Sequence, residues 1–479
     1  MKKIKIHPDK IGIHFVGIKG VGMTPLAIIA KEAGFGVTGS DVAEEFITDE
    51  ALRKAGIKPM SGFSADHIAK PDLVITTGAH NGFDNVEVKE AREKGIKIIA
   101  GGEAVGIFMN GKIFGKDYQG ISVAGTHGKT TTAGMVATIL KDNHLDPSYV
   151  IGTGDIGSLG APGHFGQGKY FVAEADEYVT EPHYDKTPRF MWQFPRITIF
   201  TNIEFDHPDA YSSLDEIVKV FAKFAKQLPD NGVLIACGDD HQIKQIIKNQ
   251  TGSVITYGFS AVNNYVIDKV SISGERMFFW VSAYGRSLGE FMLNVIGEHN
   301  ALNALAAFIA GIEVGLPVEK AKASLLAFTG SKRRLEFIGD LVTGAKVYDD
   351  YAHHPTAVKK TLQALRKQYP NKKIVCLFQP HTFSRTKKLF NDFVGAFESA
   401  DSLILVDIYP SMRESFDQTI SSSILGDAIK TKHKDVTYLP KLSDLEEYIK
   451  QKKFRSDTIL VTMGAGDIYK ISNNLNFVE

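Results

Sequence analysis

The sequence predicts an α/β protein made of three consecutive α/β domains. Three observations support this: short apolar runs alternate with helix-length segments, the alternation restarts twice, and 479 residues exceed what one domain usually holds. Strands that alternate with helices of ten or more residues form βαβ units, whose strands pair in parallel. We expect the domains at residues 1–115, 116–331 and 332–479.

The first domain is predicted to be a parallel, Rossmann-like sheet. A helix that ends near Ala33 follows its first strand, and a turn-rich stretch at 109–120 ends the domain. The expected strands are 11–17, 37–41, 72–78 and 96–102.

The central domain is predicted to combine a parallel series with a small antiparallel part. The parallel strands are expected at 121–125, 169–175, 196–203 and 232–238, and the helices at 129–141, 299–314 and 318–328. Between Ser253 and Val295, the runs VITYGF, NYVIDKVSI and RMFFWVSAY are joined by turns, so we expect antiparallel pairing. The third domain is again Rossmann-like, with strands expected at 345–351, 372–378, 401–408 and 457–464.

The charge balance and the cysteine count exclude several classes of protein. The chain has 55 Lys and Arg against 55 Asp and Glu, so no net charge draws it to nucleic acid or to an anionic membrane. Two cysteines make no disulfide framework, and no apolar run reaches the length of about 18 residues that a membrane helix needs. The N-terminal MKKIKIHPDK lacks the apolar segment of a signal peptide. We expect a cytoplasmic protein that acts on small molecules; the sequence indicates no oligomeric state.

The clearest chemical motif is Gly125-Thr126-His127-Gly128-Lys129-Thr130-Thr131, which follows a strand and opens a helix. Backbone N–H groups at a helix N-terminus bind anions, and glycine lets the loop fold closely around a phosphate. Lys129 can reach the β- and γ-phosphates of a nucleotide, and the Thr130 hydroxyl can ligate Mg²⁺. The general pattern has glycine where this chain has Val123, so the match is to a shorter Gly-x-x-Gly-Lys-Thr form. The motif predicts a P-loop ATPase-like central domain.

A second glycine loop, Gly17-Ile18-Lys19-Gly20-Val21-Gly22-Met23, follows the first strand. Its order, Gly-x-x-Gly-x-Gly, differs from the dinucleotide fingerprint, so it indicates a phosphate or nucleotide site more than NAD. Asp41 ends the second strand, where an acid that binds ribose is expected. A purely structural turn is the competing interpretation.

Acids and a histidine at strand ends are candidate metal ligands. Glu174 ends one strand, with Asp176 and Glu177 after it, and the next strand leads to His207 through Asn202-Ile203-Glu204-Phe205-Asp206. The carboxyl ends of parallel strands meet at the ligand-binding edge of a sheet. Mg²⁺ prefers oxygen ligands, and a second metal held by Glu174 and His207 is chemically reasonable. Solvated strand-end acids are the alternative.

Later segments carry weaker candidates. Asn300 and Asn303 share one face of a predicted helix, where an Asn amide can bind the adenine edge or cap the helix. The third domain has polar clusters at 332–336, 349–355 and 379–386, for which a solvated surface is the alternative.

Eight motifs, in order, resemble those of the Mur ligases of peptidoglycan precursor synthesis over essentially the whole chain. They are GIKGVGM, GTHGKTTT, EADEY, TNIEFDH, HNALNALAA, KRRLE, DDYAHHP and QPHTFSRT. The resemblance implies ATP-dependent, ADP-forming ligation of L-alanine to the carboxylate of UDP-N-acetylmuramate through an acyl phosphate, with ATP and Mg²⁺.

The resemblance also implies a role for each motif. The UDP-sugar would contact Gly17, Gly20, Val21, Gly22 and Met23, with Asp41, Thr77 and His80 near the uridine. ATP would contact the Gly125 to Thr131 loop, His299, Asn300, Arg334 at the γ-phosphate and Asp350 at the ribose. The metal ligands would be Thr130, Glu174 and His207. The amino acid would contact His353, His381 and Arg385, and the catalytic residues would be Lys129, Glu174, His207, His353, as a helper in amine deprotonation, and Arg385.

Three alternatives stay open. EADEY followed by VTEPHYDK is close to family members that attach a recycled L-alanyl-γ-D-glutamyl-diamino-acid tripeptide, whereas QPHTFSRT matches the alanine-adding members. A dinucleotide-dependent oxidoreductase would use the first glycine loop but leave GTHGKTT without a role. A non-catalytic nucleotide-binding protein would use GTHGKTT alone.

Overall fold

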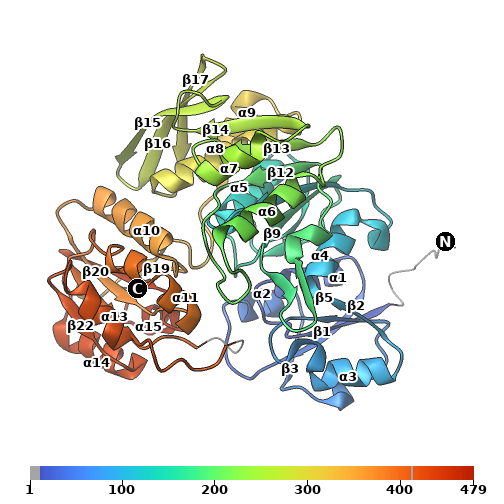
Figure 1. The fold of residues 1–479 in the computed structure, drawn as a ribbon, viewed down its shortest axis with the longest axis horizontal. Helices are drawn as coiled ribbons and strands as arrows, with labels where there is room; N and C mark the ends of the chain where they lie inside the picture. Colours follow the sequence, from blue (N-terminus) through green and yellow to red (C-terminus); the bar gives the residue numbers. More distant parts are fainter. Residues whose placement is uncertain (1–10, 411–413, 479) are drawn as a thin grey trace.

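A computed structural model describes residues 11–410 and 414–478. The N-terminal MKKIKIHPDK, where we expect no signal peptide, lies outside the described residues. Figure 1 shows three α/β bodies that follow one another along the chain, in blue, in cyan to yellow, and in orange to red. The predicted fold class is confirmed, because each body is built on its own sheet. The boundaries near residues 115 and 331 stay a prediction.

The first sheet is five-stranded and wholly parallel, in the order β3-β2-β1-β4-β5. Strand β1 lies at the switch point of this order, with its neighbours β2 and β4 on either side, and a parallel sheet binds ligands beyond the carboxyl end of such a strand. The strands are β1 (Gly12–Val16), β2 (Gly36–Asp41), β3 (Met60–Ser61), β4 (Leu73–Thr76) and β5 (Lys97–Ala100). The helices are α1 (Thr24–Glu32), α2 (Asp49–Lys54), α3 (Val86–Glu93) and α4 (Gly101–Asn110).

The central sheet has ten strands in the order β17-β16-β15-β14-β13-β12-β6-β9-β7-β8. Its parallel strands are β6 (Gln119–Ala124), β7 (Ser148–Val150), β9 (Tyr170–Ala175), β12 (Ile197–Phe200), β13 (Val233–Cys237) and β14 (Ser253–Gly258). Its antiparallel edges are β8 (Gly163–His164) at one end, and β15 (Tyr265–Ser273), β16 (Arg276–Ala283) and β17 (Arg286–Leu293) at the other. A separate hairpin comprises β10 (Val179–Glu181) and β11 (Asp185–Pro188). The helices are α5 (Lys129–Asp142), α6 (Leu214–Ala225), α7 (His241–Ile247), α8 (Glu298–Glu313) and α9 (Val318–Ser324).

One prediction for this sheet is wrong. The run VITYGF is β14, which pairs in parallel with both β13 and β15 instead of antiparallel. Helix α7 crosses over between β13 and β14, and a crossover connection returns the chain in the same direction. The antiparallel part therefore starts at β15 and includes β17, which was not predicted.

The third sheet has the order β18-β19-β23-β20-β21-β22, and all its neighbours are parallel except β18 and β19. The strands are β18 (Glu336–Asp340), β19 (Lys346–Asp350), β20 (Lys373–Phe378), β21 (Ser402–Leu405), β22 (Val436–Tyr438) and β23 (Thr458–Met463). The helices are α10 (Pro355–Gln368), α11 (Phe383–Lys388), α12 (Phe390–Val394), α13 (Ser422–Ile429), α14 (Leu442–Lys452) and α15 (Tyr469–Asn473).

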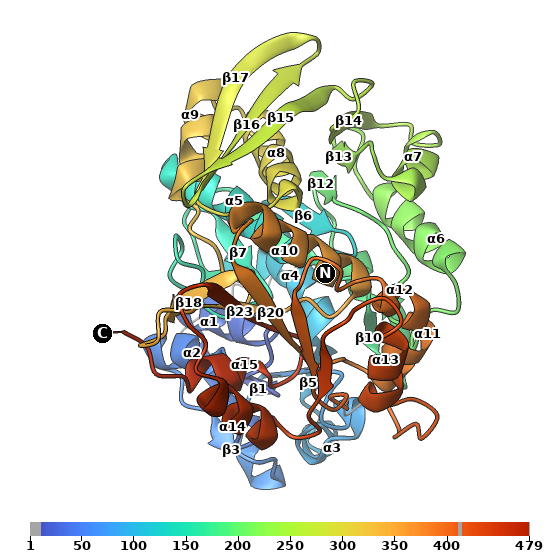
Figure 2. The ribbon, with the colours of Figure 1, turned by 90° about the vertical axis from the view of Figure 1, so that its left-hand side faces the viewer.

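The first and central bodies share a hydrophobic cluster, whereas the third has clusters of its own, against one of which Phe205 of the central body packs. Helix α1 packs against β7 and β8, and Val150, Phe171 and Ala173 of the central sheet join the apolar core around α1. The third body lies toward the viewer in Figure 2 and is packed around two further clusters.

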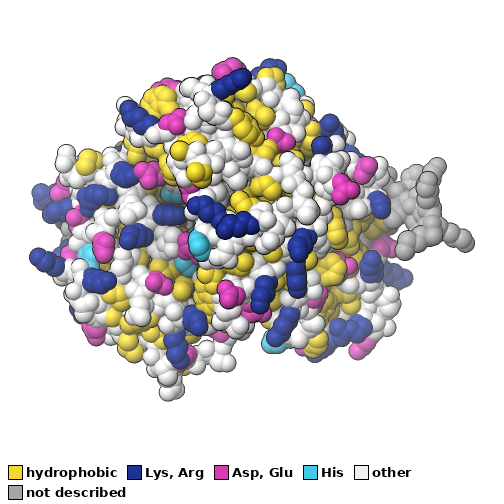
Figure 3. Space-filling view, turned by 45° about the horizontal axis from the view of Figure 1, so that its top comes forward, with side chains coloured by type: hydrophobic (Ala, Val, Ile, Leu, Met, Phe, Trp, Pro, Cys, Tyr) yellow, Lys and Arg dark blue, Asp and Glu magenta, His cyan; other side chains and the backbone are white. Residues whose placement is uncertain are grey.

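Acidic and basic side chains intermingle over the face in Figure 3. Within the described part of the chain, no helix combines the length and the apolarity that crossing a membrane requires.

Candidate active site

A cavity of about 770 Å³ lies where the three bodies meet. Its lining includes both glycine loops, the ends of β9 and β12, the start of α8, and segments of the third body. All the sequence-predicted site residues line this cavity except Asp41 and Gly125. The fold therefore brings motifs from the whole chain to one place.

The loop from Gly125 to Thr131, here called the phosphate loop, is supported by two residues that directly follow the neighbouring strand β12. Thr201 and Asn202 both donate side-chain hydrogen bonds to the carbonyl oxygen of His127, at 2.6 and 3.0 Å, and Asn202 Oδ1 accepts the N–H of His127 at 2.9 Å. Gly128, with φ +83°, is the N-cap of α5. The strand predicted over 196–203 ends at Phe200, because its last residues turn to support this loop.

Lys129 lies across the loop instead of extending into solvent. Its Nζ donates to the carbonyl oxygen of Gly125 at 2.6 Å and pairs with Glu177 Oε2 at 2.9 Å. Burial alone lowers the pKa of Lys129, but the carboxylates around it, led by Glu177 and Asp176, raise it above the ordinary value. The ammonium is therefore charged at the point where nucleotide phosphates would enter. Gly125 contributes to this arrangement through its backbone carbonyl oxygen, which accepts the hydrogen bond from Lys129.

Thr130, Glu174 and Arg334 form a second group beside the loop. The Thr130 hydroxyl accepts a 2.7 Å hydrogen bond from Arg334 Nη2, which reaches it from the third body, and it lies close enough to Glu174 to lower the pKa of that carboxyl group. Burial raises the pKa of Glu174, and its Oε1 is a buried oxygen with no hydrogen-bond partner among the described residues. An orphaned carboxylate oxygen beside a hydroxyl oxygen fits Mg²⁺, which prefers oxygen donors.

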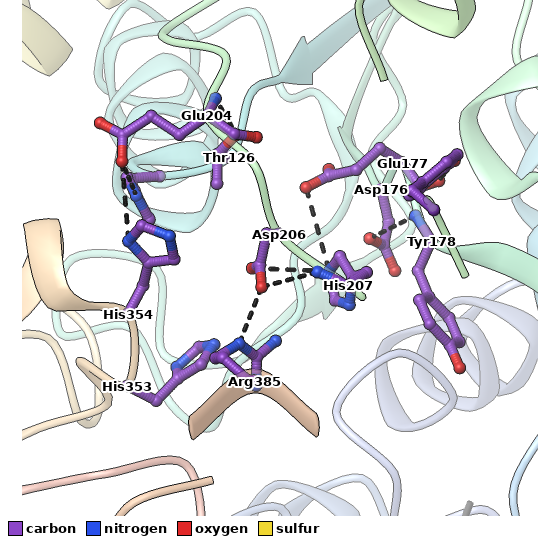
Figure 4. Close-up of polar contacts among 12 residues, drawn as sticks. Thr126, Asp176, Glu177, Tyr178, Glu204, Asp206, His207, His353, His354 and Arg385 are labelled. Carbon is purple, nitrogen blue, oxygen red and sulfur yellow. Dashed lines mark hydrogen bonds and ion pairs between the residues drawn. The ribbon is translucent and has the colours of Figure 1, made fainter. Parts of the chain in front are cut away.

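His207 lies in a different set from the one expected. Its Nε2 is 4.0 Å from Glu177 Oε1 and 3.8 Å from Asp206 Oδ2, and its ring packs against that of Tyr178 at 4.8 Å (Figure 4). The ligand atoms of His207, Asp176 and Glu177 lie within 4.8 Å of one another, a set that does not include Glu174. The predicted pairing of Glu174 with His207 around one metal stays a prediction, and Glu177 enters as a neighbour of both Lys129 and His207.

Asn300 is part of the helix body. Helix α8 has Gly297 as its N-cap, so the alternative in which Asn300 caps the helix is wrong. Asn300 donates to the carbonyl oxygen of Ile296 at 2.8 Å and accepts from Asn303 at 3.1 Å. Burial lowers the pKa of the adjacent His299 to about 4, so this imidazole is neutral at pH 7.

The carboxylate of Asp41 stabilises the first glycine loop by accepting a backbone hydrogen bond from it. Its Oδ2 accepts the N–H of Lys19 at 2.7 Å, and its Oδ1 lies 3.4 Å from His80 Nε2. Only 1% of Asp41 is exposed, so its carboxylate fixes the loop and does not face the cavity. This position argues against direct ribose contact by Asp41, whereas Thr77 and His80 do face the cavity.

Arg385 joins the third body to the central one through a buried ion pair. Its Nε lies 2.7 Å from Asp206 Oδ1 (Figure 4). Its Nη1 donates to the carbonyl oxygen of His381 at 2.8 Å. Burial alone raises the pKa of Asp206, but Arg385 and three nearby histidines hold it well below its ordinary value. Arg385 therefore lines the cavity while its guanidinium group is held in place by Asp206 and by the backbone of His381.

His353 is in an environment that conflicts with its expected role as a base. Burial, together with the charge of Arg385, holds the pKa of His353 well below its ordinary value. Its Nδ1–H donates to the carbonyl oxygen of Tyr351 at 2.8 Å, which leaves Nε2 as an acceptor. Such an imidazole is too weak a base to take a proton from an ammonium group. His353 can instead accept a hydrogen bond and orient an amine.

Asp350 is anchored at the entrance of the third body. It accepts the N–H groups of Leu335 and Ala352 at 2.8 and 2.7 Å, and burial raises its pKa to about 6. Arg333, beside Arg334, pairs with the buried Asp349 at 3.0 Å and lies against the ring of Tyr469 at 4.5 Å. Arg333 thereby fixes the segment from which Arg334 reaches the phosphate loop.

Several residues that shape the site were not assigned from the sequence. The sequence predicts Thr201 and Asn202 within a strand and Arg333 within a cluster between domains. It places Glu177 among the candidate metal ligands but gives neither Glu177 nor Asp206 a partner. Their signal was the position at a strand end, which is common to solvated acids as well. Their partners lie far away in sequence, so spacing alone did not identify them.

The chain belongs to the Mur ligase family. Family models match it at residues 12–113 (the Mur ligase family catalytic domain), 123–311 (the middle domain) and 333–466 (the glutamate ligase domain). A UDP-N-acetylmuramate–L-alanine ligase of Desulfitobacterium hafniense is 40% identical over 464 residues, which covers 97% of this chain and 99% of that protein. One of Caldanaerobacter subterraneus is 38% identical and covers 96% of each chain.

Two solved structures share the three-body architecture. The UDP-N-acetylmuramate-alanine ligase of Thermotoga maritima superposes with a TM-score of 0.80 at 29% identity and covers 97% of each chain. A murein peptide ligase of Psychrobacter arcticus gives a TM-score of 0.72 at 26% identity, covering 97% of this chain and 98% of that one.

Proposed function

We infer that the chain is an ATP-dependent ligase that joins L-alanine to UDP-N-acetylmuramate in peptidoglycan precursor synthesis. Relatives at 37–40% identity over nearly the full chain carry this activity in their names. The observation that supports it most strongly is the shared cavity, which is lined by both the phosphate loop of the central body and the first glycine loop of the first body. An oxidoreductase and a non-catalytic nucleotide-binding protein are set aside, because family membership accounts for both loops together.

The first step we propose is transfer of the γ-phosphoryl group of ATP to the muramyl carboxylate, giving an acyl phosphate and ADP. Positioning and charge stabilisation dominate phosphoryl transfer. Lys129 and Arg334 both bring positive charge to the phosphate loop, and the loop N–H groups would bind the remaining phosphate oxygens. Mg²⁺ held by Thr130 and Glu174 would neutralise phosphate charge in this step.

The second step we propose is attack of the L-alanine amine on the acyl carbon, followed by loss of phosphate. His353, His381 and Arg385 face the cavity from the third body and would orient the amino acid. Nε2 of His353 is an acceptor for an amine N–H. Because water would hydrolyse an acyl phosphate, the third body must cover the site before this step.

Phosphate release from ATP tests the proposal directly. The purified chain should release phosphate when UDP-N-acetylmuramate and L-alanine are both present, and Mg²⁺ removal by a chelator should stop it. An apolar pocket for one methyl group gives about 10–200-fold discrimination, so glycine should be a poor but measurable substrate. Release without L-alanine, or none with it, would contradict the proposal.

The second candidate is ligation of a recycled tripeptide, which the VTEPHYDK segment and the likeness to a murein peptide ligase favour. The same assay with the tripeptide in place of L-alanine separates the two. We propose L-alanine because the named relatives at 37–40% identity are alanine ligases. We also propose a cytoplasmic location, where ATP and nucleotide sugars are available.

A further inference from the structure

Two histidines and a carboxylate meet between the central and third bodies, next to the proposed catalytic groups. His127 Nε2 lies 3.4 Å from Glu204 Oε2, and His354 Nδ1 lies 3.6 Å from the same oxygen. One ligand atom from each of the three residues lies within 4.8 Å of the others. The two imidazole rings pack at 4.7 Å between centroids.

The spacing of these atoms suits a tetrahedral ion. With metal–ligand bonds of about 2.0–2.1 Å, neighbouring ligand atoms around a tetrahedral Zn²⁺ are roughly 3.3–3.5 Å apart. The two nitrogen-to-oxygen distances around Glu204 Oε2 match that edge closely. Two imidazoles and one carboxylate with an open fourth position are a donor set that Zn²⁺ takes, and all three residues line the cavity.

Neighbouring protein groups orient His354 and Glu204 for metal binding. His354 Nε2–H donates to the carbonyl oxygen of Phe205 at 3.2 Å, so the lone pair is on Nδ1, the atom that faces Glu204. This lone pair accepts a long 3.3 Å hydrogen bond from the N–H of Thr356, which a bound ion would replace. The Thr356 hydroxyl donates to Glu204 Oε2 at 2.6 Å and orients that carboxylate (Figure 4 shows Glu204 opposite His354). Metal-binding histidines commonly donate their other N–H to a backbone carbonyl in this way.

We propose that His127, Glu204 and His354 form a site for a Zn²⁺-like transition-metal ion, separate from the Mg²⁺ site at Thr130 and Glu174. The nitrogen-rich donor set selects against Mg²⁺, which demands oxygen ligands. Because His127 and Glu204 belong to the central body and His354 caps α10 of the third, an ion here fastens the two bodies together.

The test is titration of the full chain with Co²⁺ and Zn²⁺ in the presence of excess Mg²⁺, which occupies the oxygen site. We expect saturable Co²⁺ binding with the visible absorption of a four-coordinate ion, displaced by Zn²⁺. Glu204→Gln and His354→Asn should each weaken Zn²⁺ binding at least roughly tenfold. Asn at 354 keeps an N-cap acceptor for α10, so this variant retains the start of the helix.

Two control variants make the outcome specific. His164 lies between Glu32 and Asp146, but these acids contact opposite ring nitrogens and cannot share an ion with it, so His164→Ala should leave binding unchanged. His207→Ala removes the histidine of the neighbouring Asp176 and Glu177 set and should also retain the Co²⁺ spectrum. Zn²⁺ should raise the unfolding temperature of the wild-type chain and of His164→Ala, but not of Glu204→Gln.

Three results would overturn the site. They are the absence of saturable binding in the presence of Mg²⁺, binding that survives both Glu204→Gln and His354→Asn, and binding that is lost in His207→Ala instead. None of these readouts depends on ligase turnover, so failure of the site and failure of the proposed function are distinguishable.

Discussion

At the scale of single residues, Lys129 is the most exacting test of the phosphate loop. Its ammonium is held between the carbonyl oxygen of Gly125 and the carboxylate of Glu177, and nucleotide phosphates would meet it there. Lys129→Ala should lower kcat roughly 10²–10³-fold, as loss of one charge-stabilising donor usually does. Phosphate release at saturating substrates measures this.

The matched control for Lys129→Ala is Lys141→Ala. Lys141 lies in the last turn of the same helix, α5, where its contacts within the described part of the chain are long hydrogen bonds of 3.3 and 3.4 Å to backbone carbonyls. This variant should keep wild-type turnover. Equal activity of Lys129→Ala and wild type would remove the phosphate-loop role.

Glu87 is a second residue whose environment leads to a testable prediction, here on how the stability of the fold depends on pH. It is fully buried under the first sheet, where His14 lies 3.2 Å from one oxygen and His67 lies 2.7 Å from the other. Burial raises the pKa of Glu87, but hydrogen bonds from His14, Ser40 and His67 outweigh it, so its pKa lies below the ordinary value of 4.5.

A carboxyl group with a lowered native pKa stabilises the fold at neutral pH and loses that contribution as the pH falls through the native pKa. Glu87→Gln should therefore lower the free energy of unfolding by about 2–3 kcal/mol at pH 7. The difference from wild type should shrink below pH 4.5, which denaturant titrations at several pH values measure. A difference that stays constant down to pH 3 would show that the charge on Glu87 contributes nothing.

At the scale of elements, the start of α5 depends on a glycine that tolerates no side chain. Gly128 has φ +83°, and a Cβ there would lie 2.5 Å from Asn303 Oδ1 of helix α8. Gly115 has φ +68° with no atom within 4 Å of such a Cβ. Gly115→Ala should cost only the left-handed backbone penalty of about 1–2 kcal/mol.

Gly128→Ala should cost more than Gly115→Ala and should also weaken ATP binding, because it displaces either the loop or Asn303. Comparing the unfolding free energy and the ATP affinity of the two variants separates backbone strain from the steric clash. ATP affinity that falls equally in both variants would contradict the packing argument.

Elements and loops that depend on local pattern were predictable, whereas their long-range partners were not. The buried runs that form β1, β6 and β20 and the two glycine loops are visible as contiguous segments. Strand β17 was missed because Gly289 and its charged residues interrupt apolar alternation, and β22 because it has only three residues. The direction of β14 follows from the crossover at α7 and not from its own residues.

The same limit applies to the site. Its lining residues were predictable because strand ends and glycine loops place them at the ligand-binding edges of parallel sheets. The pairing of His207 with Glu177, the contact of Asp41 with Lys19, and the environment of His353 depend on side-chain packing between distant segments. Spacing along the chain carries no information on such contacts.

At the scale of the whole molecule, the two interfaces between bodies differ in character. The first and central bodies share an apolar cluster around α1, which resists separation. The third body meets the central one mainly through polar contacts: Arg385 with Asp206, Arg334 with Thr130, and His354 with the carbonyl oxygen of Phe205. The side chain of Phe205 adds an apolar contact with the core of the third body. Polar interfaces of this kind favour relative motion of domains. The third body is therefore the one we expect to open and close over the cavity.

The Asp206–Arg385 pair is the contact whose loss should release the third body. Both side chains are about nineteen-twentieths buried, so Asp206→Asn leaves the Arg385 charge desolvated without its counter-ion, which typically costs about 3–5 kcal/mol. Opening of the domain is the route by which Arg385 regains water. Without ligands, the variant should show a larger radius of gyration in small-angle X-ray scattering and a raised KM for L-alanine. Arg366→Ala breaks a 2.5 Å ion pair with Asp401 inside the third body and should change neither quantity. A radius of gyration that stays at the wild-type value in Asp206→Asn would mean that the polar contacts are not what holds the third body closed.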